Sequence, residues 1–349
     1  VALAIGAAVI LCYTFMGGFM AVCVTDFVQG TLMLIGLLVV PLVAYFLLPG
    51  NLTDLITQSG VTGGANAYLN PFINGDRPYT FVEIFSQLAW GFGYCGMPHV
   101  LVRFMAVRSE KELKKSWVIA IIWDLLSLTA AFAIAVIGRA YLLPTILGEN
   151  GAASSESVFI EMIRKVFTSQ LALPFIGGLF LCGILAAIMS TADSQLLVTA
   201  SAVSEDLYHN FIKKDADSKE ILRVSRITVI VIAIIAFAIA WDPNSSIMGL
   251  VSNAWAGLGA AFGPIVVMSL FWRRTNLQGA IAGMVTGGLT VIIWDYIPLV
   301  GGQTLGTYTG LYSLAVGFLL SLVVIVIVSL LTKAPSKEIT DEFDKVAAK

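Results

Sequence analysis

Long apolar stretches alternate with short polar ones along the whole chain, and this pattern restricts the protein to a lipid bilayer. Of its 349 residues, 58% are hydrophobic and only 12% are charged. A soluble domain carries about 25% charged residues, and a run of about 20 apolar residues can cross about 30 Å of hydrocarbon. The sequence therefore predicts an all-α, multi-pass membrane protein with the bilayer as its surroundings.

Nine stretches have the length and hydropathy of a transmembrane helix. They cover residues 1–15, 19–48, 80–105, 116–143, 172–203, 224–241, 246–272, 277–297 and 308–332. Tyr13-Thr14 with Gly17-Gly18 predicts a tight turn between the first two. Segment 156–168 is amphipathic and charged, which predicts a short helix outside the core. The Gly, Asn, Thr and Pro residues of 49–79 predict a long loop.

The positive charges give the expected orientation. Of the 20 Lys and Arg residues, all but Arg77, Arg139, Arg164 and Lys165 fall on one side of the nine spans. An excess of Lys and Arg marks the cytoplasmic side. We therefore expect a plasma (inner) membrane protein with one transmembrane domain, 1–333, and a cytoplasmic C-terminal tail, 334–349. Because the chain begins at Val1 inside an apolar span, we expect further N-terminal helices in the natural protein.

A stripe of small and hydroxyl-bearing residues runs along the apolar stretch 172–203. Its members follow one another at helical spacings of three and four, so they share one face. They are Gly183, Ala186, Ala187, Ser190, Thr191 and Ser194. In lipid, such a face either lets another backbone approach closely or offers oxygen atoms to a ligand. The residues alone leave both alternatives open.

The stretch 80–105 is interrupted by Trp90-Gly-Phe-Gly-Tyr-Cys-Gly-Met-Pro98, with three glycines and a proline in nine residues. Gly favours unwound backbone and Pro removes a helical hydrogen bond. The freed carbonyls need partners, so such a break survives in a membrane only where it is buried in protein or lines a cavity. Trp90 and Tyr94 flank the break. A substrate site is therefore favoured over a proline kink against a neighbouring helix.

Three carboxylates fall inside apolar stretches, where charge is costly and often functional. Asp26 and Asp124 are each interpreted either as interfacial groups that cap a helix or pair with a loop arginine, or as ion-handling groups. Asp193 either belongs to an ion or substrate site or pairs with a neighbouring helix. The small residues between Asn253 and Pro264 are explained by close helix packing alone.

Several functional classes lack their usual signals. The charges are segregated by loop, which gives no basic patch for nucleic acid. The sequence has no CxxC, HExxH, phosphate loop or GxSxG motif, so nothing indicates an enzyme. An ion channel would need a continuous polar pore. A sensor fused to a kinase would need more than the short tail after Lys333.

The motifs together resemble the solute:sodium symporter family, and within it the sodium/proline symporters. The matching segments follow in order along most of the chain: Tyr13–Phe19, Thr25-Asp26 with Gln29, Gly91–His99, Arg103–Ala106, Gly183–Thr191, Gln195–Val198, Glu205–Tyr208, Leu250–Gly257 and Ala334–Ser336. The resemblance implies a fold of two inverted five-helix repeats, like the sodium-coupled leucine transporter, with alternating access. The first repeat would be truncated in this chain.

The family's functional residues map onto this sequence one by one. The resemblance implies a sodium site at Ala187, Ser190 and Thr191, whose other half lies in a helix that this chain lacks. It implies a proline site with Trp90 and Tyr94, and Pro98 at the bend, and it makes Tyr13 a residue that the family needs. Asp26, Asp193 and Ser194 are the remaining candidates for ion handling or gating. No cofactor is implied beyond Na⁺ as the coupling ion.

The implied function is sodium-coupled uptake of a small solute, with L-proline as the expected solute. One departure bears on this choice. Proline symporters follow Ser-Thr with a hydrophobic residue and then Ser-Cys, whereas this chain has Ala192-Asp193-Ser194. Another amino acid or a pantothenate-like carboxylate therefore stays open, as does a sensor or channel that does not transport.

Overall fold

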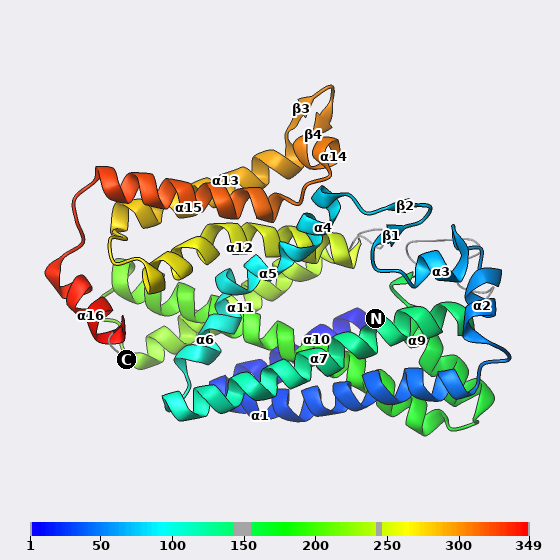
Figure 1. The fold of residues 1–349 in the computed structure, drawn as a ribbon. Helices are drawn as coiled ribbons and strands as arrows, with labels where there is room; N and C mark the ends of the chain where they lie inside the picture. The colour runs from blue at the N-terminus through cyan, green and yellow to red at the C-terminus, as the bar shows by residue number, and fades with distance from the viewer. Residues whose placement is uncertain (1, 143–154, 242–245, 348–349) are drawn as a thin grey trace. The chain divides into compact units, whose positions relative to one another are not determined.

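A computed structural model describes residues 2–142, 155–241 and 246–347 (Figure 1). The chain forms two compact units. Unit 1 comprises Val1–Arg77 and Val107–Asn244, and unit 2 comprises Pro78–Ala106 and Ser245–Lys349.

Seven helices in the described part of the chain are long and apolar enough to cross a membrane. Unit 1 contributes Val22–Phe46 of α1 (Ala2–Phe46), α7 (Glu110–Tyr141), α10 (Pro174–Ser201) with its π-helical continuation η3 (Ala202–Ile212), and α11 (Ser218–Ile239). Unit 2 contributes α12 (Ile247–Phe271), α13 (Leu277–Tyr296) and α15 (Ser313–Leu331). Each corresponds to an expected span, while 1–15 and 80–105 are not among the seven.

The first two expected spans form one helix. The helical backbone of α1 continues through Gly17-Gly18, so the tight turn predicted there is wrong. Glycine is frequent in membrane helices. The backbone at a glycine stays helical there, because an opened backbone in lipid loses its hydrogen bonds without gaining water. Turn signals that end a helix in water therefore carry less weight here.

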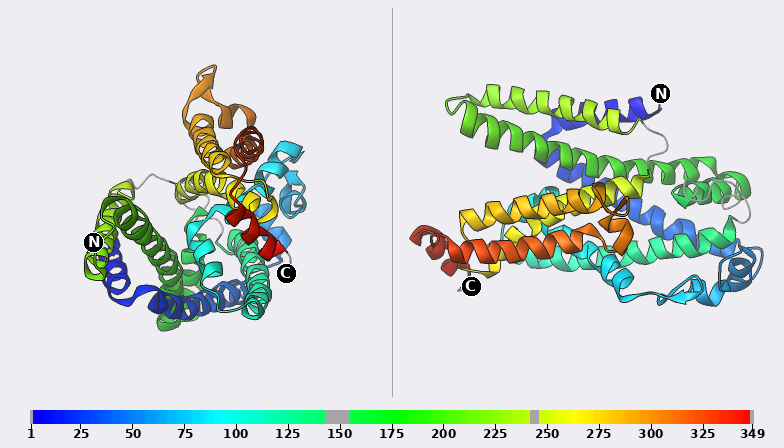
Figure 2. Two further views of the ribbon diagram at one scale, coloured as in Figure 1. Left: turned by 90° about the vertical axis from the view of Figure 1, so that its left-hand side faces the viewer. Right: turned by 90° about the horizontal axis from the view of Figure 1, so that it is seen from above.

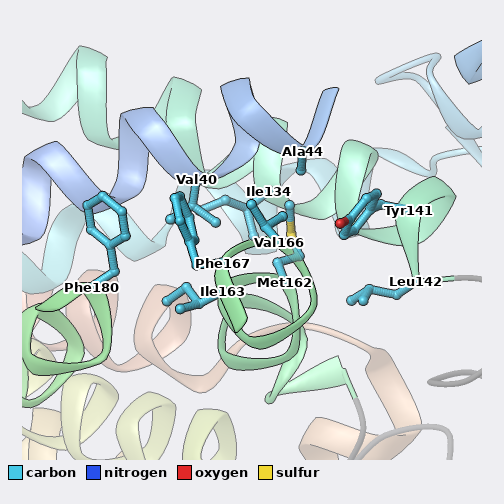
Figure 3. Close-up of a cluster of buried hydrophobic side chains, with 10 residues drawn as sticks. All are labelled: Val40, Ala44, Ile134, Tyr141, Leu142, Met162, Ile163, Val166, Phe167 and Phe180. Carbon is cyan, nitrogen blue, oxygen red and sulfur yellow. The ribbon is translucent and has the colours of Figure 1, made fainter. Parts of the chain in front are cut away.

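A cluster of buried hydrophobic side chains holds unit 1 together (Figure 3). Residues from α1, α7 and α10 surround the short helix α9 (Val158–Ile163) and the π-helical η2 (Arg164–Gln170). Met162, Ile163 and Val166 have no exposed surface. The prediction that 156–168 lies outside the core is therefore wrong, because its apolar face packs into the centre of the unit.

The segment 49–79 is also more ordered than the predicted loop. It contains α2 (Leu52–Gln58), α3 (Gly64–Tyr68) and the two-stranded sheet of β1 (Ile73–Asn74) and β2 (Arg77–Pro78). Ile56 is fully buried beside Val136 and Ala140 of α7. The segment is attached to the unit by single buried apolar side chains in short helices. Such single residues form no periodic pattern, so the sequence does not indicate these helices.

Unit 2 is built on three long helices that pack side by side, α12, α13 and α15 (Figure 2). Glycines on α13 permit this contact. A side chain on Gly283 would overlap Ile325 of α15, and one on Gly287 would overlap the backbone of Ala260 in α12. Small residues let helix backbones approach closely, which supports the packing interpretation of the Asn253–Pro264 stretch.

Short elements lie at both ends of unit 2. At one end lie β3 (Pro298–Val300), β4 (Gln303–Thr304) and α14 (Leu305–Thr309). At the other end, Asn276 caps α13 through Gly279 N–H and also donates to Thr332 Oγ1 and Lys333 O, each at 2.7 Å. The tail helix α16 (Lys337–Ala347) follows at this end.

Candidate functional site

Three oxygen atoms converge on one turn of α10. The hydroxyls of Ser190 and Thr191 both donate to the Ala187 carbonyl oxygen, at 3.1 and 3.3 Å. Each hydroxyl oxygen keeps its lone pairs, so the turn presents two neutral acceptors, and the Ala187 carbonyl becomes a third when the hydroxyls turn their protons away from it. Ala187 and Ser190 are half-buried and Thr191 is exposed within unit 1.

The small-residue stripe of α10 divides into two parts. Gly183 and Ala186 are buried, and a side chain on Gly183 would meet the Leu32 carbonyl of α1 at 3.5 Å. The Ala187, Ser190 and Thr191 part remains accessible within the unit. The close-packing alternative therefore holds for Gly183 and Ala186, while oxygen donation to a ligand by the other part of the stripe stays a prediction.

Asp193 has no exposed surface. Ser194, also buried, donates to the Ser190 carbonyl at 2.8 Å and lies 3.4 Å from Asp193 Oδ1. Asp193 is thus buried, whereas Thr191, two residues earlier on α10, is exposed.

The other predicted gating residues lie on α1. Gly36 faces Phe180 and Leu32 faces Gly183, so α1 and α10 run antiparallel. Continuing this register by about two turns brings half-buried Asp26 to the level of Ser190. Tyr13 also lies in α1, but its side chain falls outside the described residues.

The predicted break in 80–105 is present in unit 2. The stretch forms α4 (Phe81–Leu88), α5 (Trp90–Gly93), the 3₁₀ turn η1 (Tyr94–Gly96) and α6 (Pro98–Met105). Met97 is extended, with φ −84° and ψ 111°, and Pro98 is the first residue of α6. Proline suits that position because its missing N–H would have no helical partner.

Aromatic rings gather around the break. The Trp90 ring stacks on Trp255 of α12, with centroids 5.3 Å apart, and on Tyr312, with centroids 6.1 Å apart. Tyr94, 54% exposed, meets Trp255 edge-on at 4.8 Å. Trp255 Nε1 donates to the Trp90 carbonyl at 2.9 Å. This bond supplies a partner for a carbonyl at the interrupted helix.

The structure groups the predicted residues in two places. Ala187, Ser190 and Thr191 share one turn in unit 1, whereas Trp90, Tyr94 and Pro98 share the broken segment of unit 2. Sequence reasoning missed Trp255 and Tyr312 as partners of Trp90. In the sequence, the only indication for Trp255 is a large ring within a stretch of Gly and Ala residues. Nothing in the sequence indicates Tyr312.

The sequence matches the family model of the sodium:solute symporter family over residues 1–287. It is 42% identical over 330 residues to the osmoregulated proline transporter OpuE of Bacillus subtilis (strain 168), covering 95% of this chain and 63% of that protein. It is 39% identical over 347 residues to the sodium/proline symporter of Escherichia coli (strain K12), covering 98% and 64%.

The chain thus spans slightly less than two thirds of the length of these relatives. Among solved structures, a Na⁺-coupled sialic acid symporter in a substrate-bound outward-open state aligns with a TM-score of 0.67 at 18% identity, over 95% of this chain and 66% of that one. This likeness confirms the expected leucine-transporter-like, inverted-repeat fold, while the number of nine spans stays a prediction. By sequence and by fold, this multi-pass membrane chain belongs to the sodium:solute symporter family.

Proposed function

We propose that the protein couples the inward movement of Na⁺ to the uptake of a small solute by alternating access. The observation that carries this proposal is the turn of α10 on which the Ala187 carbonyl and the Ser190 and Thr191 hydroxyls converge. Family membership supports it, because this turn carries the residues that match the family's sodium ligands.

Na⁺ is a hard cation and prefers oxygen ligands, as the other hard cations of biology do. Ser190 and Thr191 can supply two without placing a fixed negative charge in lipid, and the small Ala187 leaves its carbonyl uncovered. Buried Asp193 and half-buried Asp26 are secondary candidates for ion handling or gating, with Ser194 and Tyr13. No other cofactor is part of the proposal.

L-proline is the solute that we propose, because relatives at about 40% identity are named proline transporters. Trp90 and Tyr94 would hold its apolar ring, and Pro98 keeps the helix interrupted beside them. The Asp193 position, which departs from the proline symporters, keeps another amino acid as the second candidate.

The orientation follows from the charges at the ends of the helices. Arg273 and Arg274 follow α12, and the Lys residues of the tail follow α15 on the same side. We propose that this side is cytoplasmic and that the protein lies in the plasma membrane.

The test is Thr191→Ala in the intact gene product, measured as radiolabelled proline uptake into proteoliposomes. Losing one of the proposed oxygen ligands should raise the Na⁺ concentration for half-maximal uptake by about tenfold, which corresponds to about 1.4 kcal/mol. The matched control is Thr199→Ala. Thr199 lies two turns further along α10, and its hydroxyl makes the same bond to the preceding turn, to Gln195 at 2.8 Å. A sodium dependence equal to that of the control would overturn the sodium assignment.

A further inference from the structure

Unit 2 contains a cavity of ≈ 380 Å³ that shares only Trp90 with the proposed proline site. It lies between the first turns of α12 and α15, the last turn of α13, and the end of α4. Among its walls are Trp90, Asn253, Asp295 and Tyr312. The first turn of α12 is at the opposite end of that helix from Arg273 and Arg274. In the proposed orientation the cavity therefore lies at the non-cytoplasmic end of unit 2.

One carboxylate faces this cavity, and half of its hydrogen-bonding capacity is free. Asp295 Oδ2 accepts a hydrogen bond from Ser313 Oγ at 2.6 Å. Among the described residues, Asp295 Oδ1 has no hydrogen-bond donor, and none of their Lys or Arg side chains forms an ion pair with this carboxylate. Gly306 leaves space beside Asp295 Oδ1, because a β-carbon at position 306 would lie 3.0 Å from this oxygen.

The aromatic wall of the cavity is held rigidly in place. The Tyr312 hydroxyl donates to the Ser252 carbonyl at 2.7 Å, and the Tyr312 N–H donates to Ser86 Oγ at 3.1 Å. The Tyr312 ring lies nearly parallel to that of Trp90, at an angle of 12°. Aromatic faces attract cations, and a wall fixed before binding lowers the entropic cost of binding.

We propose that this cavity is a second binding site, specific for an organic ammonium group, which receives the amino end of the solute before it reaches Tyr94. This inference rests on the proposed uptake function. The Asp295 carboxylate would accept from the ammonium group while the apolar part of the solute lies on Tyr312 and Trp90. Trp90 would then contact the solute at both sites, because it lies in the broken helix and also lines the cavity.

The size and charge of the cavity select this class of ligand. A volume of ≈ 380 Å³ falls in the range of small-molecule sites, about 300–1,000 Å³. It is more than ten times the share of one water in the liquid, about 30 Å³, so a bare Na⁺ would not fill it. An anion without an amine would meet the charge of Asp295. The neutral amide of Asn253 is available as a donor to the carboxylate of a zwitterion.

The experiment measures ligand binding rather than transport. Pyrrolidine, which is protonated at neutral pH and has proline's ring without its carboxylate, is titrated into the purified intact gene product in the absence of Na⁺, with tryptophan fluorescence as the signal. Asp295→Asn removes the charge from this hydrogen bond, which water partly screens, so the variant should bind pyrrolidine about tenfold more weakly. Tetrahydrofuran-2-carboxylate, which has the carboxylate and no amine, should bind at least tenfold more weakly than pyrrolidine to the unmodified protein.

Two further variants make the result decisive. Gly306→Ala keeps the charge but places a methyl group against Oδ1, so it should weaken pyrrolidine binding as well and serves if Asp295→Asn does not fold. Glu338→Gln, in α16 at the opposite end of the unit, should bind pyrrolidine as the unmodified protein does. Unchanged pyrrolidine affinity in both Asp295→Asn and Gly306→Ala would overturn the proposal, as would equal binding of the anionic analogue.

The same variants separate this proposal from the proposed function. If uptake is sodium-coupled, Asp295→Asn should raise the KM for proline and leave the maximal rate unchanged. If the protein shows no sodium-coupled uptake but binds pyrrolidine in a manner dependent on Asp295, the uptake proposal fails and the ammonium site stands.

Discussion

Single glycines determine how closely the broken segment packs on α12. A β-carbon on Gly96 would lie 2.7 Å from the Leu258 carbonyl oxygen and 2.7 Å from the Gly263 nitrogen. Both are backbone atoms of a long helix and have little freedom to move away. Gly91, in the same segment, has no neighbouring atom within 4 Å of a β-carbon. The two positions therefore differ in how closely they pack against α12.

Gly96→Ala should lower the stability of the protein by about 1–3 kcal/mol, the usual cost of overpacking a tight contact. Gly91→Ala should leave stability unchanged or raise it slightly, because alanine is the better helix former. The measurement is thermal unfolding of the detergent-solubilised intact gene product. Equal melting temperatures for the two variants would show that the contact between η1 and α12 is looser than described.

At the scale of elements, the tail helix α16 is held by one well-formed ion pair. Arg273 Nε and Nη2 donate to the two oxygens of Asp344, each at 2.7 Å. Ile339, Phe343 and Val346 line a hollow with Trp272 at the end of α12. The hydrogen bonds from Arg273 hold the pKa of the Asp344 carboxyl below its usual value.

Acid should therefore release α16. Because the folded pKa of Asp344 is lowered, the ion pair contributes its full stability above the ordinary carboxyl pKa and loses it as the pH falls through the lowered value. Protection of the α16 amides against hydrogen exchange should be constant from pH 7 to 5 and decrease in more acidic solution. Asp344→Asn should show the decreased protection at every pH. Equal protection in the variant at neutral pH would mean that the apolar face alone holds the helix.

At the scale of the whole molecule, the distribution of charge predicts which side of the membrane each loop occupies. Lys333 and Lys337 follow α15 at the end where Arg273 and Arg274 follow α12, whereas Arg139 lies in the last turn of α7. In the proposed orientation the first group is cytoplasmic and the second faces outward.

Trypsin should therefore cut the tail at Lys333 or Lys337 in inside-out membrane vesicles and leave it intact in right-side-out vesicles. The readout is the loss of an epitope placed after Lys349, with detergent-permeabilised vesicles as the control for accessibility. Cleavage from the outside of right-side-out vesicles would reverse the topology and would move the cavity with Asp295 to the cytoplasmic side.

The sequence by itself determined the features that depend on composition and local chemistry. The apolar stretches predicted a membrane protein, because only helices of that length satisfy their backbone in lipid. Gly91, Gly93, Gly96 and Pro98 predicted the break in the third stretch, because these residues act on their own backbone. The family motifs predicted the fold, and the oxygen-bearing turn at Ala187–Thr191 was visible from helical spacing.

Only the tertiary structure decided which side chains meet. It buried Asp193 while leaving Thr191 accessible, placed Trp255 and Tyr312 against Trp90, and drew 156–168 into the centre of unit 1. These outcomes depend on contacts between helices far apart in the chain, and a spacing pattern along one helix does not specify the partner that each face will meet.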